Sequence, residues 1–234
     1  MTTTDDRDYL PAMARPGLLR WYDPFSRLMG AREAQWQLVA QAGIEPGATV
    51  LEIGCGTANA LLLAARAVPG ATFTGLDPDA AALAVADRKA RRAGAAVRLD
   101  RGYADRLPYP DSTVDRVLSS FMLHHMPEDQ QRAALREVHR VLAPGGRLHL
   151  LDFDGEMSGP VGRLLHRRGR PGHAHGHAGH GHGNAAHGHA AAVHAGPVHA
   201  DVPEMLAAAG FADVAELAHG TTPIGSHTFY RATR

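Results

Sequence analysis

The segment VLEIGCGTAN, residues 50–59, holds the side chains best suited to chemistry: a carboxylate and two glycines after an apolar run. Gly54 and Gly56 lack a Cβ, so a ligand can approach the backbone closely where a strand leads into a helix. The Glu52 carboxylate, two residues before the first glycine, favours a cationic ligand and disfavours a pyrophosphate. The pattern therefore predicts a ligand that carries an amino group and a sulfonium.

The same glycines have two other interpretations. Dinucleotide-binding dehydrogenases use G-x-G-x-x-G at this junction, which makes an NAD(P)-dependent oxidoreductase the first alternative. Asn59 occupies the last position of that pattern in this chain, and together with Glu52 it disfavours the dinucleotide. A strand–turn–helix junction that binds no ligand is the second alternative.

Asp77 lies in the next motif, FTGLDPD, residues 73–79. In a Rossmann-like sheet an acid at this place accepts hydrogen bonds from ribose hydroxyls. By itself the residue is equally well explained as the N-cap of the helix that follows, because aspartate is a favoured cap. The glycine motif upstream favours the ribose interpretation.

Charge and composition restrict the classes of partner. The 234 residues include 24 Lys and Arg and 24 Asp and Glu, so the formal charge is zero with neutral histidine. Such a balance predicts neither a nucleic-acid partner nor binding to an anionic membrane. The single cysteine, Cys55, excludes an internal disulfide. The polar start MTTTDDRDYL does not resemble a signal peptide, and the apolar run 60–65 is far shorter than a membrane helix, so we expect a cytoplasmic protein.

The elements that must position these motifs follow from the apolar pattern. Strands and helices alternate, which predicts a mostly parallel sheet covered on both faces, with ligands bound beyond the carboxyl ends of its strands. The predicted strands are 48–53, 71–76, 96–99, 113–120, 147–153, 213–218 and 227–232, and the predicted helices are 18–30, 31–42, 59–68, 79–93, 128–142 and 202–209. A turn at 144–146 is expected to lead into the fifth strand.

The stretch from Arg167 to His199 consists mainly of Gly, Ala, His and Arg. This stretch has few large apolar side chains, and the surface that they could bury is too small to offset the entropy lost on ordering the chain. We therefore expect a disordered insertion at 161–200. Its closely spaced histidines predict incidental binding of Ni or Zn, with a dedicated metal site as the alternative. The expected organisation is an N-terminal helical lid segment at 1–45, a core at 46–160, the insertion, and a segment at 201–234 that completes the same sheet.

The order of motifs across residues 21–153 resembles the class I S-adenosylmethionine-dependent methyltransferases. The motifs are VLEIGCGT, GLDPD, GYADRLPYPDSTVDRV, SSFMLHHM and LREVHRVLAPGGRLHLLDF. They resemble most closely the methyltransferase type 11 group and its ubiquinone/menaquinone C-methyltransferase branch. The resemblance implies a Rossmann-like α/β fold with seven strands, the last antiparallel. It also implies S-adenosylmethionine as donor and a small-molecule methyl acceptor.

The resemblance also implies roles for individual positions. Residues of the glycine loop are expected at the methionine and ribose portions of the donor, and Asp77 at the ribose. Pro78 is expected on the adenine, with Ala104 and Asp105 at the adenine edge. Ser120 and Phe121 are expected at the methionine side. These positions are Glu52, Gly54, Cys55, Gly56, Asp77, Pro78, Ala104, Asp105, Ser120 and Phe121. Two departures stand out, because Ala58 replaces a glycine usual in the family and Tyr103 replaces a frequent aspartate.

Catalytic residues are less clearly indicated. Methyl transfer from a sulfonium is an in-line displacement, for which alignment and desolvation can suffice. His124 and then His125 are the predicted bases, since they follow the fourth strand, and a helix-capping or packing role is the alternative. Tyr22 and Arg27 resemble the lid of the quinone branch, with packing against helices as the alternative. A non-catalytic methyltransferase-like module that binds a metal or a partner remains the last alternative for the whole chain.

Overall fold

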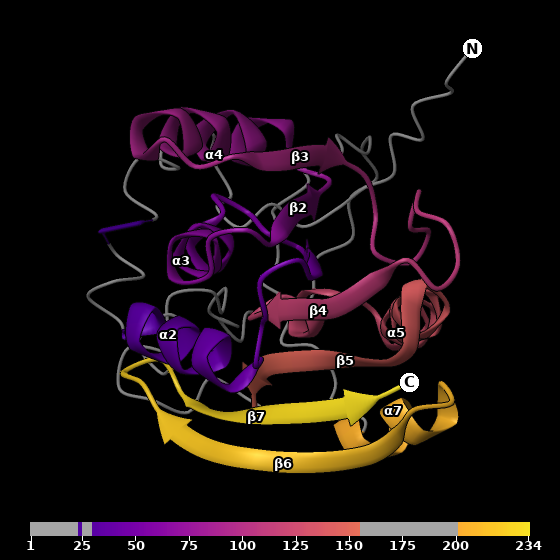
Figure 1. Ribbon diagram of the computed structural model, residues 1–234. Helices are drawn as coiled ribbons and strands as arrows, with labels where there is room; N and C mark the ends of the chain where they lie inside the picture. Colours follow the sequence, from indigo (N-terminus) through magenta and orange to yellow (C-terminus); the bar gives the residue numbers. More distant parts are fainter. Residues whose placement is uncertain (1–22, 25–29, 155–200) are drawn as a thin grey trace, which may run out of the picture.

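The computed structural model describes residues 23–24, 30–154 and 201–234 (Figure 1). Several predictions fall outside these residues: the helix at 18–30, the roles of Tyr22 and Arg27, and the insertion at 161–200. The proposed boundaries between the lid segment, core and insertion therefore stay predictions.

A seven-stranded sheet runs through the described residues, in the order β3-β2-β1-β4-β5-β7-β6. The first five strands pair in parallel, whereas β7 is antiparallel to both β5 and β6, which confirms the predicted mostly parallel α/β sheet. The strands are β1 (Thr49–Ile53), β2 (Thr72–Asp77), β3 (Val97–Arg101), β4 (Val114–Ser120), β5 (Leu142–Phe153), β6 (Ala212–Thr221) and β7 (Ser226–Thr233).

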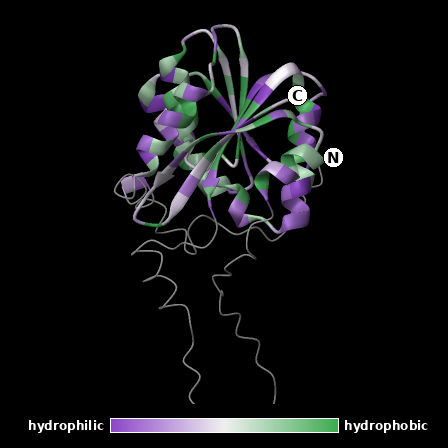
Figure 2. Cartoon of the chain, turned by 90° about the horizontal axis from the view of Figure 1, so that it is seen from below, coloured by the Kyte–Doolittle hydropathy of each residue, from purple (hydrophilic) through white to green (hydrophobic). Residues whose placement is uncertain are grey.

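Helices cover both faces of this sheet, as Figure 1 shows. One face carries α2 (Ala31–Gln41), α3 (Asn59–Ala67) and α4 (Ala80–Ala93), and the other carries α5 (Glu128–Val141) and α7 (Val202–Ala208). Alternate residues of β1 supply the two cores, since Leu51 packs with α5 and α7 while Val50 packs with α3 and α4. The helices carry both hydrophilic and hydrophobic residues (Figure 2), as expected for helices with one buried face.

Local signals in the sequence explain where α4 begins and ends. The Asp79 side chain caps its first turn, accepting the backbone N–H groups of Ala81 at 2.8 Å and Ala82 at 3.3 Å. Gly94 ends the helix with a positive φ of 62°, a conformation that glycine adopts without steric cost. Asp79 and Gly94 thus bound α4, which confirms the helix predicted at 79–93.

The predicted turn at 144–146 is wrong as a boundary, because β5 already begins at Leu142. Leu142 pairs with Val114, and the register with β4 shifts before Arg147 pairs with Arg116. The extra residues bulge within the strand. Backbone hydrogen bonds with Arg234 hold this bulge, from the Gly145 N–H at 3.2 Å and to the Gly146 carbonyl at 2.9 Å. These two hydrogen bonds tie the bulged residues to Arg234, next to the end of β7.

Acid should destabilise this fold through His149 on β5. The side chain is 1% exposed, and among the described residues neither ring nitrogen has a hydrogen-bond partner. Burial, together with nearby arginines, lowers its pKa to about 4. The unfolded chain therefore takes up this proton near pH 6.5, before the folded chain does, and stability is lost as the pH falls from there toward 4.

We expect His149 to account for a loss on the order of 3 kcal/mol in the free energy of unfolding across that range. Denaturant titrations of the wild type and His149→Phe at several pH values measure it. The variant should lose less stability in acid, whereas His219→Gln, at a mostly exposed side chain, should behave as the wild type. Equal acid sensitivity of His149→Phe and the wild type would contradict the prediction.

Candidate functional site

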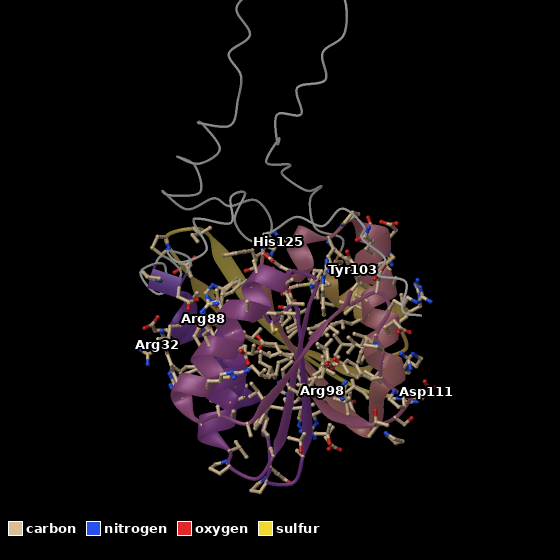
Figure 3. The ribbon with its side chains drawn as sticks, turned by 90° about the horizontal axis from the view of Figure 1, so that it is seen from above. Arg32, Arg88, Arg98, Tyr103, Asp111 and His125 are labelled. Carbon is tan, nitrogen blue, oxygen red and sulfur yellow. The ribbon has the colours of Figure 1, made fainter. Side chains whose placement is uncertain are left out.

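A cleft of about 270 Å³ lies at the carboxyl ends of β1, β2 and β4. Parallel strands bring their carboxyl ends to one edge, so residues far apart in sequence meet there. Figure 3 shows His125 and Tyr103, which both line the cleft, at this edge of the sheet. The cleft is also lined by every position that the resemblance singled out for the donor: Glu52, Gly54, Cys55, Gly56, Asp77, Pro78, Ala104, Asp105, Ser120 and Phe121.

Glu52 reaches the cleft from β1 and is 2% exposed. Its carboxylate accepts the backbone N–H of Leu61, in α3, at 2.9 Å. Burial raises the pKa of Glu52 to about 8; the Leu61 hydrogen bond opposes this shift, and the charge of Asp77 adds to it. An acid with such a pKa holds its proton at neutral pH until a positive charge arrives beside it.

Asp77 ends β2 and ties the loop after β1 to the loop after β2. One carboxylate oxygen accepts the Gly56 N–H at 2.7 Å, and the other accepts the Asp79 N–H at 2.8 Å. Burial raises the pKa of Asp77, and these two hydrogen bonds oppose the shift. The helix-cap alternative for Asp77 is wrong, because Asp79 caps α4. Each carboxylate oxygen has two acceptor sites, so further donors in the cleft can still bind Asp77.

The two glycines of the motif are required for different reasons. At Gly54 φ is 62°, and an added Cβ would overlap Cγ of Met122, so there is no space for a side chain. At Gly56 φ is 52° and an added Cβ meets no atom within 4 Å. The backbone conformation favours glycine at both positions, whereas only Gly54 is closely packed against the protein.

Ala58, which stands where the family usually has glycine, also adopts a left-handed conformation, with φ of 60° and ψ of 39°. That conformation costs a residue with a Cβ roughly 1–2 kcal/mol. The residue is fully buried at the start of α3. Ala58 therefore carries a local backbone strain that a glycine at this position would avoid.

Beyond the glycines, Asp23 fixes the start of α3. Its carboxylate accepts hydrogen bonds from Thr57 Oγ1 at 2.6 Å and Asn59 Nδ2 at 2.9 Å, and it pairs with Lys89 Nζ at 2.8 Å. Burial raises the pKa of Asp23. The hydrogen bonds from Lys89 and Thr57 and the charge of Lys89 together outweigh burial, so the pKa lies below its usual value. Asn59, the residue that disfavoured a dinucleotide motif, thus has a structural role beside the cleft.

The segment after β4 forms the opposite wall. Ser120 Oγ accepts a hydrogen bond from Gln35 Nε2 of α2 at 3.2 Å, and the Phe121 N–H donates to the Leu151 carbonyl at 2.8 Å. Phe121 holds a positive φ of 53°, which is uncommon for a bulky residue. The chain therefore turns sharply at the end of β4 and directs the next residues over the cleft.

The structure places the two histidines predicted as bases, His124 first and His125 second, in different environments. His125 lines the cleft, and burial, together with the charge of His124, lowers its pKa to about 4. His124 lies outside the cleft lining, with its ring centroid 4.0 Å from that of His125. Its Nδ1 is 2.5 Å from a carboxylate oxygen of Asp152, at the end of β5.

Sequence reasoning missed several residues of this region, among them Gln35, Met122 and Asp152. Gln35 lies on a helix before the first strand, where no motif distinguishes it. Met122 sits between two residues that were considered, Phe121 and the histidine pair. Asp152 had a usable signal, because an acid at the carboxyl end of a parallel strand lies at the ligand-binding edge.

Comparisons with known proteins agree on one family. A family model described as a methyltransferase domain matches residues 50–146. The demethylmenaquinone methyltransferase of Thermus thermophilus is 34% identical over 149 residues, which cover 62% of this chain and 66% of that protein. The enzyme of the same name from Listeria welshimeri is 38% identical over 111 residues, covering 47% and 46%. The chain thus spans between 46% and 66% of the length of these two curated relatives.

Solved structures share the fold. The crystal structure of a SAM-dependent methyltransferase from Aquifex aeolicus superposes with a TM-score of 0.63 and covers 94% of this chain and 99% of its own. Sequence identity is 19%, so this likeness concerns the architecture. None of the helices in the described part of the chain has the length and apolar character needed to cross a membrane.

Proposed function

Since this chain belongs to the class I S-adenosylmethionine-dependent methyltransferase family, we propose that it binds S-adenosylmethionine in the cleft and transfers the methyl group to a small-molecule acceptor. One observation supports this most directly. Two buried carboxylates, Glu52 and Asp77, flank a glycine loop in a single cleft. Buried acids of this kind favour a cationic ligand and penalise an anionic one.

The residues of the cleft suit this donor part by part. A Cβ at Gly56 would meet no protein atom within 4 Å, which leaves room for a ligand against the backbone. Glu52 and the glycines hold the methionine and ribose portions, and Asp77 binds the ribose hydroxyls. Pro78, Ala104 and Asp105 surround the adenine, while Ser120 and Phe121 lie at the methionine side.

Catalysis then depends on alignment in a dry site. The bound donor supplies a methyl group activated by a sulfonium. Apolar side chains of the lining, Leu76, Met122 and Met126, exclude water and keep the local dielectric low. Because the site holds the acceptor and the methyl group in line, a reaction between two separate molecules becomes effectively unimolecular.

The oxidoreductase alternative fits this cleft less well. A dinucleotide would bring its pyrophosphate to the glycine loop, directly beside Glu52 and Asp77. The third glycine of a dinucleotide motif allows close packing of helix and strand, but here Asn59 bonds to Asp23 instead.

The residues of the cleft indicate the methyl acceptor less clearly than they indicate the donor. The two curated relatives are named for demethylmenaquinone, which makes that compound the first acceptor to assay. A small organic acceptor is the proposal for this chain, whatever the atom that receives the methyl group.

Isothermal calorimetry with S-adenosylmethionine, S-adenosylhomocysteine and NADH tests the proposed donor. We expect both sulfur compounds to bind and NADH not to bind, because only the sulfur compounds place an amino group rather than a pyrophosphate near Glu52. Binding of NADH without either sulfur compound would refute the proposed function. Transfer of a labelled methyl group to demethylmenaquinone, supplied in its oxidised and its reduced form, would extend the test to turnover.

A further inference from the structure

Asp152 is a buried acid whose contacts are directed at one histidine. It is 2% exposed at the end of β5. One oxygen lies 2.5 Å from Nδ1 of His124 and also accepts the Phe153 N–H at 2.9 Å, and the other accepts the His124 N–H at 3.2 Å. Burial raises the pKa of Asp152, but the charge of His124 and these hydrogen bonds lower it below its usual value. The carboxylate therefore stays ionised.

This geometry fixes the tautomer of the imidazole. An ionised carboxylate only accepts hydrogen bonds, so Nδ1 of His124 carries a proton, and whenever the ring is neutral Nε2 has a free lone pair. Within the described residues nothing is hydrogen-bonded to that nitrogen, and the side chain is 16% exposed. The other titratable group that touches the ring there is His125. His124 is thus oriented as a proton acceptor.

Aromatic rings connect this pair to the cleft. Phe121 lines the cleft, and its ring centroid is 4.7 Å from that of Phe153. Phe153 in turn meets the His124 ring edge to face, at 5.2 Å. His227 packs against Phe121 from β7, at 5.7 Å. Aromatic rings therefore connect the cleft to the ring of His124, and their planar surfaces suit a planar ligand.

We propose that His124, positioned by Asp152, accepts the hydroxyl proton of an aromatic methyl acceptor that packs against the rings of Phe121 and Phe153. The inference rests on the proposed function. In the step, the acceptor's O–H bond breaks and its proton passes to Nε2 of His124. The oxygen forms a bond to the methyl carbon while the carbon–sulfur bond breaks, and the sulfur keeps that electron pair as a neutral thioether. Asp152 stabilises the imidazolium that results.

The first test needs no acceptor. The Nδ1 proton of His124, in its short hydrogen bond to Asp152, should give a downfield proton NMR signal in the wild type. Asp152→Asn and His124→Gln should both lose the signal, whereas Asp115→Asn should keep it. Asp115 is a matched control because its carboxylate also accepts a backbone N–H, from Thr49 at 2.8 Å, but at the opposite end of the sheet. A signal that persists in Asp152→Asn would overturn the pairing.

The second test measures methyl transfer from labelled donor to a panel of hydroxyaryl compounds, each matched with an aryl amine. We expect His124→Gln and Asp152→Asn to lower turnover of the hydroxyaryl compounds roughly 100-fold or more, with donor affinity unchanged. The wild-type rate should fall in acid, because the reaction needs an unprotonated base, and this acidic limb should vanish in His124→Gln. Asp115→Asn should keep both rate and pH profile.

Each failure has a different meaning. If the wild type does not bind S-adenosylmethionine, the proposed function itself fails. Donor binding with no transfer to any hydroxyaryl compound, or with transfer to the amines alone, would overturn the acceptor class. If the folded His124→Gln variant turned over the acceptor at the wild-type rate, the role of the histidine would be refuted. If its turnover fell but the acidic limb of its pH profile stayed unchanged, the histidine would have a structural role.

Discussion

The affinity for S-adenosylmethionine is expected to rise about tenfold per pH unit between about pH 6 and pH 8, and Glu52→Gln should abolish this rise. Burial holds the pKa of Glu52 near 8 in the free protein, so the acid is protonated over most of that range. Pairing with a cationic ligand requires the carboxylate, and binding must therefore release a proton. Since the proton is easier to release at higher pH, affinity increases until about pH 8.

Calorimetry in buffers with different heats of ionisation measures the released proton directly. The rise in affinity should end near pH 8, because an α-amino group such as the donor's loses its own proton at about 7.7–8.0. Glu45→Gln, at an exposed position in the loop before β1, serves as the control and should keep the slope. Equal affinity at pH 6 and pH 8 in the wild type would show that Glu52 does not pair with the ligand's charge.

Gly54→Ala should weaken donor binding roughly 10- to 100-fold and destabilise the protein. An added Cβ would overlap Cγ of Met122 and lie 2.8 Å from its Cβ, and the second atom cannot move without the backbone. Overpacking of this kind costs about 1–3 kcal/mol, in addition to roughly 1–2 kcal/mol for a left-handed conformation. Met122 lines the cleft, so its displacement changes the cleft's shape.

Gly94→Ala is the matched control, because Gly94 has the same φ of 62° but an added Cβ there meets no atom within 4 Å. It should share the backbone cost and leave donor affinity unchanged. Thermal unfolding and donor titration of both variants separate strain from steric clash. If both variants lost the same stability and kept full affinity, the contact with Met122 would have no role in shaping the site.

Several features of this protein follow from the sequence because they depend on local chemistry. The periodic pattern of apolar residues predicted the helices and strands, and their order implies a parallel sheet. In such a sheet every strand–helix loop reaches the same edge. The sequence alone therefore assigns motifs separated by tens of residues, such as those at Glu52, Asp77 and Ser120, to one cleft.

Other features depend on register and burial, which no local pattern encodes. The sequence predicted His124 and then His125 as bases, but their environments differ because Ser120 of β4 pairs with Leu151 of β5. This register brings Asp152 beside His124, 28 positions away, while His125 turns to the cleft. The raised pKa of Glu52 likewise arises only once α3 packs over β1 and removes the carboxylate from water, because the energy of a charge depends on the dielectric around it.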